Sequence, residues 1–143
     1  MEHRIEFVCE RSGVRYINDS KGTNPDSTVK AIEAMDRPTV LILGGYDKHT
    51  GFEEVFNALP GSRVKTCVVL GQTADEIMET ARSHGLEGIC HRCETFREAV
   101  EKCRDLAEPG DIVLFSPACA SWDMFENYEQ RGRVFKSIVS RFE

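Results

Sequence analysis

The sequence predicts an α/β domain with a mainly parallel sheet, helices on both faces of the sheet, and a preceding N-terminal β-hairpin. Short, continuously apolar runs such as Thr39–Leu43 and Ile112–Phe115 are typical of strands buried on both faces of a parallel sheet. Segments with apolar residues at helical spacing follow these runs, so that strand and helix alternate four times. At 143 residues the chain is most simply a single domain, residues 1–143, that can bury a real core.

The N-terminal third carries local signals for a hairpin and a helix. Ile5–Cys9 and Val14–Asn18 are β-prone, and the polar stretch Glu10–Gly13 between them predicts the turn of an antiparallel hairpin. A helix is expected over Pro25–Met35, because Asn24 is a good N-cap and proline suits the first helical position.

The remaining elements follow from the same kinds of signal. Gly85 is well placed to end one helix, and Thr95 to cap the next. Ser121 is expected to cap the last helix with its hydroxyl oxygen. The other predicted elements are helix Phe52–Leu59, strand Val64–Leu70, helix Ala74–His84, strand Gly88–His91, a helix from Thr95 to about Ala107, and helix Trp122–Phe142, interrupted near Gly132.

Composition excludes several classes of function. The net charge of −6 argues against broad electrostatic binding of nucleic acid or of an anionic membrane. Apolar runs are too short for a membrane span, and no apolar segment follows Met1 as in a signal peptide. We therefore expect a cytoplasmic protein that binds neither nucleic acid nor membrane.

The six cysteines are expected to be reduced thiols, as is usual in cytoplasmic proteins. They are Cys9, Cys67, Cys90, Cys93, Cys103 and Cys119. Cys90 and Cys93 form a lone C-x-x-C, whereas a structural zinc site needs four ligands. His84 and His91 would complete such a site only if the fold brought them there. We expect no metal, and a thiol redox role for Cys90 and Cys93 is an alternative hypothesis.

Three polar loops follow predicted strands and precede predicted helices. Asn18–Ser27 contains a carboxylate, a lysine and hydroxyls, a set that suits magnesium, ribose, phosphate or carboxylate groups. Gly44–Lys48 places two glycines before a lysine, and Ser116–Ser121 is rich in small residues. Carboxyl ends of parallel strands share one edge of the sheet, so these loops are expected to converge. Each is also compatible with an ordinary polar connection.

The chain has no phosphate-binding P-loop and no dinucleotide fingerprint. Four stretches, in order, nevertheless resemble the Mur ligases of peptidoglycan synthesis: His3-Arg4 with the hairpin, Asn18–Pro25, Leu43–Lys48, and Ser116–Phe125 followed by Arg131-Gly132. The Asp-Ser-Lys-x-Thr-Asn form within the second stretch resembles the branch of the family that adds D-glutamate. The resemblance covers essentially this whole chain, but only the C-terminal third of such an enzyme.

This resemblance implies a Rossmann-like fold and a part in an ATP-dependent ligase. The family's first domain binds a UDP sugar, its central domain carries the P-loop, and its C-terminal domain brings the amino acid. ATP and Mg²⁺ would act in the full-length enzyme, with UDP-N-acetylmuramoyl-L-alanine bound by the missing domains. The natural protein would continue upstream, with Met1 an alternative or added start. We expect the isolated chain to be inactive, to hold no cofactor tightly and to be monomeric.

Site residues carry over from the same resemblance. Arg4, Asp19 and Lys21 match residues that close over ATP, and Lys21 is also expected to be catalytic. Five others match residues that hold D-glutamate: Thr23, Lys48, Ser121, Trp122 and Tyr128. The sequence departs from relatives in having tryptophan at 122 for leucine, tyrosine at 128 for phenylalanine, and histidine at 49 where glycine is frequent.

A stand-alone binding module for a small anionic metabolite is the competing hypothesis, because it predicts the same loops. The two hypotheses differ in whether the natural chain continues upstream with a P-loop.

Overall fold

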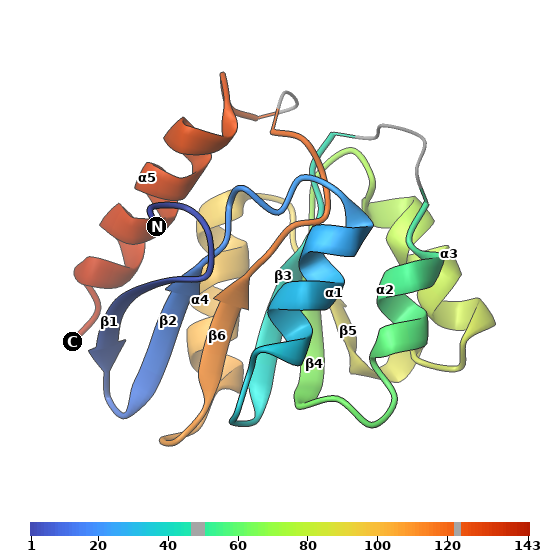
Figure 1. Ribbon diagram of the computed structural model, residues 1–143, viewed down its shortest axis with the longest axis horizontal. Coiled ribbons are helices and arrows are strands. Elements are labelled where there is room, and N and C mark those ends of the chain that lie inside the picture. Colours follow the sequence, from blue (N-terminus) through green and yellow to red (C-terminus); the bar gives the residue numbers. More distant parts are fainter. Residues whose placement is uncertain (47–50, 122–123) are drawn as a thin grey trace.

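The computed structural model describes residues 1–46, 51–121 and 124–143 of the chain. Its centre is a six-stranded sheet with the order β1-β2-β6-β3-β4-β5 (Figure 1). The strands are β1 (Glu6–Arg11), β2 (Val14–Asn18), β3 (Thr39–Leu43), β4 (Val64–Val69), β5 (Cys90–Arg92) and β6 (Ile112–Phe115). Among the strands of the described residues, β1 and β2 form the one antiparallel pair, so the predicted hairpin and mainly parallel sheet are both confirmed.

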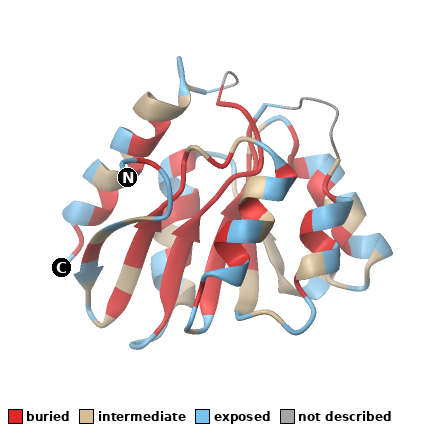
Figure 2. Ribbon diagram, viewed as in Figure 1, coloured by how far each residue is buried: buried red, intermediate tan, exposed pale blue. Residues whose placement is uncertain are grey.

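Helices cover both faces of this sheet, as predicted. They are α1 (Pro25–Glu33), α2 (Glu53–Ala58), α3 (Ala74–Ser83), α4 (Phe96–Leu106) and α5 (Tyr128–Ser140), with a 3₁₀ turn, η1 (Glu87–Ile89), before β5. The first three helices pack on one face, and α4 and α5 pack on the other (Figure 1). The central strands β3 and β6 are buried along their whole length, which explains their continuous apolar sequences (Figure 2).

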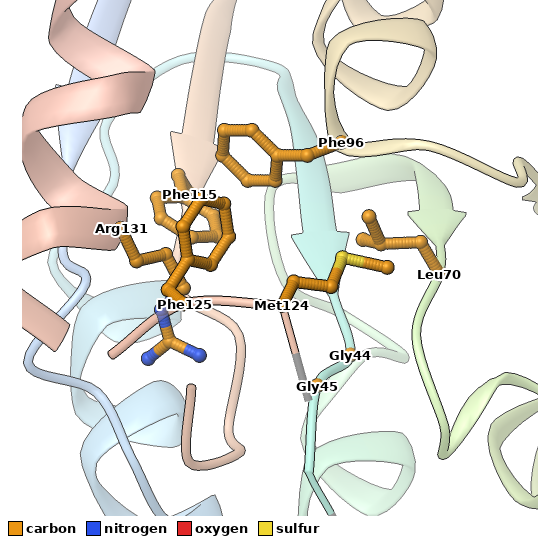
Figure 3. A pocket seen from close by; sticks show the side chains of 8 residues that line it. All are labelled: Gly44, Gly45, Leu70, Phe96, Phe115, Met124, Phe125 and Arg131. Carbon is orange, nitrogen blue, oxygen red and sulfur yellow. The ribbon is translucent and has the colours of Figure 1, made fainter. Parts of the chain in front are cut away.

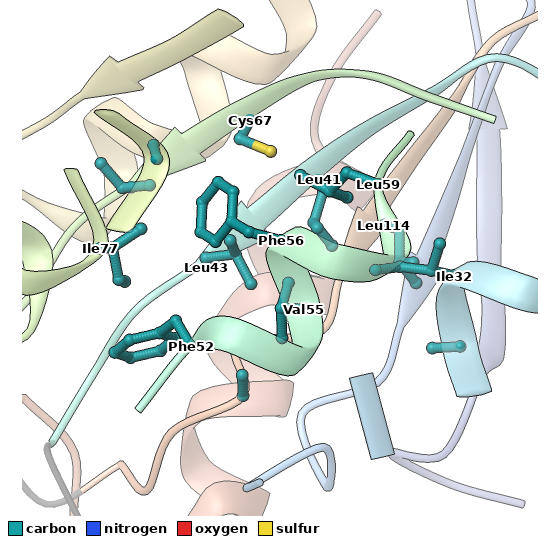
Figure 4. Packing of buried hydrophobic residues seen from close by; sticks show 14 of the residues in the cluster. Ile32, Leu41, Leu43, Phe52, Val55, Phe56, Leu59, Cys67, Ile77 and Leu114 are labelled. Carbon is teal, nitrogen blue, oxygen red and sulfur yellow. The ribbon is translucent and has the colours of Figure 1, made fainter. Parts of the chain in front are cut away.

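Side chains alternate between two cores along each central strand. Leu41 and Leu43 of β3 face α1–α3 and pack around Phe56 and Val55 of α2 (Figure 4). Val40 and Ile42 of β3 belong to the core beneath α4 and α5, where Phe115 of β6 contacts the rings of Phe96 and Phe135. The sheet is therefore packed between two helical layers, with a core on each of its faces.

Local signals located most element boundaries to within two residues. The Asn24 side chain accepts a hydrogen bond from the Ser27 amide, with Pro25 in the first turn. Thr95 and Glu98 form a complete capping box at the start of α4. The hairpin turn is shorter than predicted, because the strands extend to Arg11 and from Val14.

The start of the last helix differs from the prediction. Ser121 does not cap it; its carbonyl oxygen instead accepts hydrogen bonds from the amides of Met124 and Phe125 in a turn. Helix α5 begins only at Tyr128, where the Asn127 side chain accepts from the Gln130 amide at 2.8 Å. The Phe125 ring packs edge-on against Phe96 of α4, which holds Phe125 against the domain ahead of the helix.

The predicted interruption near Gly132 is also absent, because α5 runs unbroken from Tyr128 to Ser140. Across the described residues, none of the helices has the length and apolar character to cross a membrane.

Candidate functional site

The candidate site lies at the carboxyl end of β6, the strand between β2 and β3. Leu114 pairs with Ile17 on one side and with Leu41 on the other, so the loops after these three strands emerge together. The chain leaves β2 and β3 toward helices on one face and leaves β6 toward the helix on the other (Figure 1). Such a change of direction is where open α/β sheets bind ligands.

Backbone hydrogen bonds join the three loops directly. Ala118 donates to the Gly22 carbonyl at 2.9 Å, Gly44 to that of Pro117 at 3.0 Å, and Tyr46 to that of Ala120 at 2.8 Å. The convergence predicted from the sequence is therefore present in the described parts of the loops. Lys48, the predicted ligand of the second loop, lies outside the described residues.

Close backbone approach requires glycine in the second loop. A Cβ atom on Gly45 would lie 2.5 Å from the Ala120 carbonyl oxygen, and one on Gly44 would overlap the Leu70 carbonyl. Both residues also have a positive φ, which side chains disfavour. Ala118 in the facing loop has a φ of 63°, a conformation that costs a non-glycine residue roughly 1 kcal/mol.

Asp19 is buried and ties the first loop to two other segments. Its Oδ2 accepts a hydrogen bond from the Ser116 hydroxyl at 2.6 Å, and its Oδ1 accepts one from the Ile5 amide at 3.0 Å. The Ser116 hydroxyl is also 2.9 Å from that of Thr28 on α1. Burial raises the pKa of Asp19 above its ordinary value, although the two hydrogen bonds and the charge of Arg4 oppose that shift.

Lys21 and Tyr128 lie side by side and are both half-buried. The Lys21 ammonium is 6.0 Å from the centre of the Tyr128 ring, which permits a cation–π contact. His3 holds both residues, because its carbonyl accepts the Lys21 amide at 2.9 Å and its ring meets that of Tyr128 edge-on at 6.0 Å. Lys21, which was predicted to contact ATP, thus lies beside Tyr128, which was predicted to contact D-glutamate.

The N-terminal segment presents Arg4 in a bend. Arg4 is exposed and stands between two residues in the left-handed region, His3 with a φ of 65° and Ile5 with a φ of 43°. Such values are unusual for a β-branched residue such as isoleucine and are maintained only by surrounding contacts. Here the Asp19 carboxylate holds the Ile5 amide.

Ion pairs fasten the same segment to α5. The Lys136 ammonium lies 2.7 Å from a carboxylate oxygen of Glu2 and 3.2 Å from one of Glu6. His3 places a ring nitrogen within 4.8 Å of these carboxylates, as a metal site would require. Because Lys136 already pairs with both acids, this cluster is better explained as an anchor of the N-terminal segment.

Arg131 on α5 is a buried cation beneath the first loop. Its Nε donates to the Ser20 hydroxyl at 3.0 Å, and an Nη donates to the Ser20 carbonyl at 2.7 Å. The Ser20 hydroxyl in turn donates to the Tyr128 carbonyl at 2.7 Å. Because Ser20 stands between Asp19 and Lys21, Arg131 fixes the loop that carries both.

A small cavity lies among these elements (Figure 3). Its volume of about 10 Å³ is close to the space of one water molecule. It is lined by Gly44, Gly45, Leu70, Phe96, Phe115, Met124, Phe125 and Arg131. The guanidinium group of Arg131 is the charged group in this otherwise apolar lining. An open groove of about 210 Å³ adjoins it at Met124, beyond the ends of β4 and β5.

The other predicted site residues differ in how far they are buried and in whether the structure describes them. Thr23 is half-buried, and its amide donates to the Lys21 carbonyl at 2.8 Å. Ser121 is buried at the rim, in the turn that leads to α5. Trp122, like Lys48, lies outside the described residues.

Sequence reasoning assigned no role to five residues that hold the loops in place, which are His3, Ser20, Thr28, Ser116 and Arg131. One of them left a detectable signal. Arg131 stands four residues before Phe135 and so continues the apolar stripe of α5, where an arginine must be buried with partners. The roles of the others depend on contacts between segments distant in the sequence, such as the Ser116–Asp19 bond.

Comparison with known proteins places these loops in a family context. The model of the Mur ligase glutamate ligase domain matches residues 3–119. UDP-N-acetylmuramoylalanine–D-glutamate ligases from Thermoanaerobacter sp. (strain X514) and Pelotomaculum thermopropionicum are 53% and 56% identical over 98% and 96% of this chain. The chain spans only 31% and 30% of their lengths, so about a third of such a protein is compared.

Solved structures resemble the fold at low identity. The UDP-N-acetylmuramate-alanine ligase of Thermotoga maritima has a TM-score of 0.63 at 15% identity, covering 98% of this chain and 30% of that one. Escherichia coli FolC in complex with ADP has a TM-score of 0.66 at 18% identity, covering 99% and 32%. These likenesses support the fold that the sequence predicted.

Proposed function

Because the chain belongs to the family of Mur ligase glutamate ligase domains, we propose that it is the amino-acid-binding C-terminal domain of an ATP-dependent ligase. This ligase joins D-glutamate to UDP-N-acetylmuramoyl-L-alanine, the activity for which the 53% and 56% identical relatives are named. Their greater length supports the view that further domains complete the enzyme. The protein would act in the cytoplasm as a monomer.

The observation that carries this proposal is the meeting of three loops around the end of β6. D-glutamate offers two carboxylates and one amine, and therefore needs cations and hydroxyl groups at one place. Thr23, Ser121 and Tyr128 lie in or beside the joined loops, and Lys48 and Trp122 belong to the same loops in the sequence. We assign these five residues to the amino acid.

Arg4, Asp19 and Lys21 form the side of the site that we assign to ATP. Arg4 and Lys21 supply cations for phosphate groups, and Lys21 also stabilises negative charge during transfer. Both oxygens of Asp19 already accept hydrogen bonds within the domain. We therefore assign Asp19 a double role, in which it holds the bend that carries Arg4 and exchanges one bond for a nucleotide contact on closure.

ATP would supply the chemistry by phosphorylating the substrate carboxylate, with Mg²⁺ accompanying the nucleotide on the missing domains. The residues of this chain would orient the amine of D-glutamate toward the activated carbonyl carbon. A new C–N bond then forms, the C–O bond to phosphate breaks, and the amine loses a proton. Holding the amine in line for attack makes the step effectively unimolecular, which is the main contribution of a binding domain.

The decisive test uses the full-length protein that contains this chain. Phosphate release should require ATP, UDP-N-acetylmuramoyl-L-alanine and D-glutamate together, and should disappear when L-alanine or a diamino acid replaces D-glutamate. The isolated chain is the matched control and should release no phosphate above a heat-killed sample. Equal use of another amino acid, or release in proportion to the isolated chain, would refute the proposal.

A further inference from the structure

Two cysteines distant in the sequence face each other across neighbouring strands. Cys67 of β4 is paired directly with Cys90 of β5 in the parallel ladder. Adjacent strands lie about 4.8 Å apart, within the roughly 4.4–6.8 Å between Cα atoms that a disulfide spans. Cys67 belongs to the core on the α1–α3 face, and Cys90 packs against that core (Figure 4 shows Cys67). The Cys90 thiol donates a hydrogen bond to the Leu86 carbonyl at 3.6 Å.

Cys93, the other member of the C-x-x-C motif, lies on the opposite face. Its amide continues the ladder by donating to the Val69 carbonyl at 2.9 Å. Residues three apart in an extended chain point to opposite sides, and Cys93 packs against the core formed by α4 and α5. The thiol that faces Cys90 is therefore that of Cys67, which the sequence motif does not include.

The two facing thiols differ in access and in acidity. Cys90 is partly exposed, whereas Cys67 is fully buried. Donation from the neighbouring Cys67 thiol to a Cys90 thiolate lowers the pKa of Cys90, and the same interaction together with burial raises the pKa of Cys67. Because the thiolate is the reactive form, an oxidant in solution meets Cys90 first.

We propose that Cys67 and Cys90 form a disulfide site that reacts with low-molecular-weight disulfides. The Cys90 thiolate attacks one sulfur of oxidised glutathione, forms a mixed disulfide and expels one glutathione thiolate. Cys67 then loses its proton to solvent and attacks the Cys90 sulfur. The protein S–S bond forms, the second glutathione thiolate leaves, and one oxidised glutathione has become two reduced ones. The proposal does not depend on the ligase function.

The test maps disulfides in the 143-residue chain after reduction, removal of reductant and incubation with oxidised glutathione. Peptide mass spectrometry should find Cys67 joined to Cys90, at the cost of two hydrogen atoms. Far-ultraviolet circular dichroism before incubation confirms that each sample is folded. A Cys90–Cys93 or Cys93–Cys103 bond in place of the Cys67–Cys90 bond would overturn the proposal.

Three variants separate the steps. Cys67→Ala should stop at a glutathione adduct on Cys90, and Cys90→Ala should leave Cys67 unmodified. Cys93→Ala is the matched control and should still form the Cys67–Cys90 bond. If a variant at buried Cys67 does not fold, the mapping of the parent chain and the Cys93→Ala control still decide the question. A parent chain in which Cys90 carries glutathione while Cys67 stays reduced would contradict the proposed resolving step.

Discussion

The carboxylate of Asp19 and the hydroxyl of Ser116 are 2.6 Å apart, although 97 positions separate them in the sequence. This bond joins the loop after β2 to the end of β6. The second oxygen of the same carboxylate holds the Ile5 amide, so one buried side chain fixes three segments of the candidate site.

The parent chain should lose stability as pH rises and Asp19 becomes charged, and replacing Asp19 with asparagine should remove that loss. Burial raises the pKa of Asp19, so its contribution to the free energy of unfolding is full below the unfolded pKa of about 3.9 and falls as pH rises through the folded pKa. The uncharged amide of asparagine can accept a hydrogen bond from the Ile5 amide with its oxygen and donate one to the Ser116 hydroxyl with its nitrogen. Denaturant titrations from about pH 3.5 to about pH 7 measure the free energy of unfolding of both proteins. That of the parent chain should fall with rising pH relative to that of Asp19→Asn.

Asp26→Asn is the matched control, because Asp26 is an exposed carboxylate that pairs with Lys30 on α1. This variant should not show the gain at higher pH. A difference between parent and Asp19→Asn that stayed constant with pH, or changed in the opposite direction, would contradict the assigned cause of the shift.

Arg131→Met should destabilise the domain, because it leaves the Ser20 carbonyl and hydroxyl without their buried donor. Each unsatisfied buried group costs about 1–3 kcal/mol in the free energy of unfolding. Arg133→Met is the control on the same helix, and its exposed side chain should change stability by less than about 0.5 kcal/mol. Urea titration of both variants measures the difference, and equal effects would show that the Ser20 contacts contribute little.

Gly132→Ala should lower stability, contrary to the usual effect in a helix. Alanine normally gains about 1 kcal/mol over glycine there, but its Cβ would overlap the ring of His3. We expect a loss of roughly 1–3 kcal/mol, as for an overpacked core. In a His3→Ala background the same change should become neutral or stabilising. A double-mutant cycle with no coupling between the two positions would reject the contact as the cause.

In the full-length ligase, replacing Lys21 or Lys48 with alanine should impair the use of different substrates. A charge-assisted hydrogen bond contributes about 1.5–3 kcal/mol, so Lys48→Ala should weaken D-glutamate use roughly ten- to a hundred-fold, with ATP dependence nearly unchanged. Lys21→Ala should chiefly disturb ATP dependence and turnover. Steady-state kinetics with each substrate varied in turn separates the two effects.

Lys30→Ala is the control for these variants, because Lys30 is exposed on α1 and its salt bridge to Asp26 is a surface pair. It should leave both substrate dependences unchanged. An apparent D-glutamate affinity within about two-fold of the parent in Lys48→Ala would show that the amino acid does not depend on that loop.

The sequence by itself determined the elements whose signals are local. Strand β3 has the predicted bounds Thr39–Leu43, because a short, mainly apolar run followed by glycines favours a strand buried on both faces. Asn24 and Thr95 cap the helices they were predicted to cap, since a cap depends on a side chain and an amide three residues later. The convergence of the loops was predicted because the carboxyl ends of parallel strands lie at one edge of the sheet.

Tertiary structure decided which polar groups are buried and what they contact. Asn127 caps α5 in place of Ser121, and the preceding Phe125 is held by its ring contact with Phe96, which is distant in the sequence. The bond of Asp19 to Ser116, and the pairing of Cys67 with Cys90, likewise join distant segments. Such contacts depend on strand register and on the face that each side chain occupies, and a local pattern of residues specifies neither until the sheet is assembled.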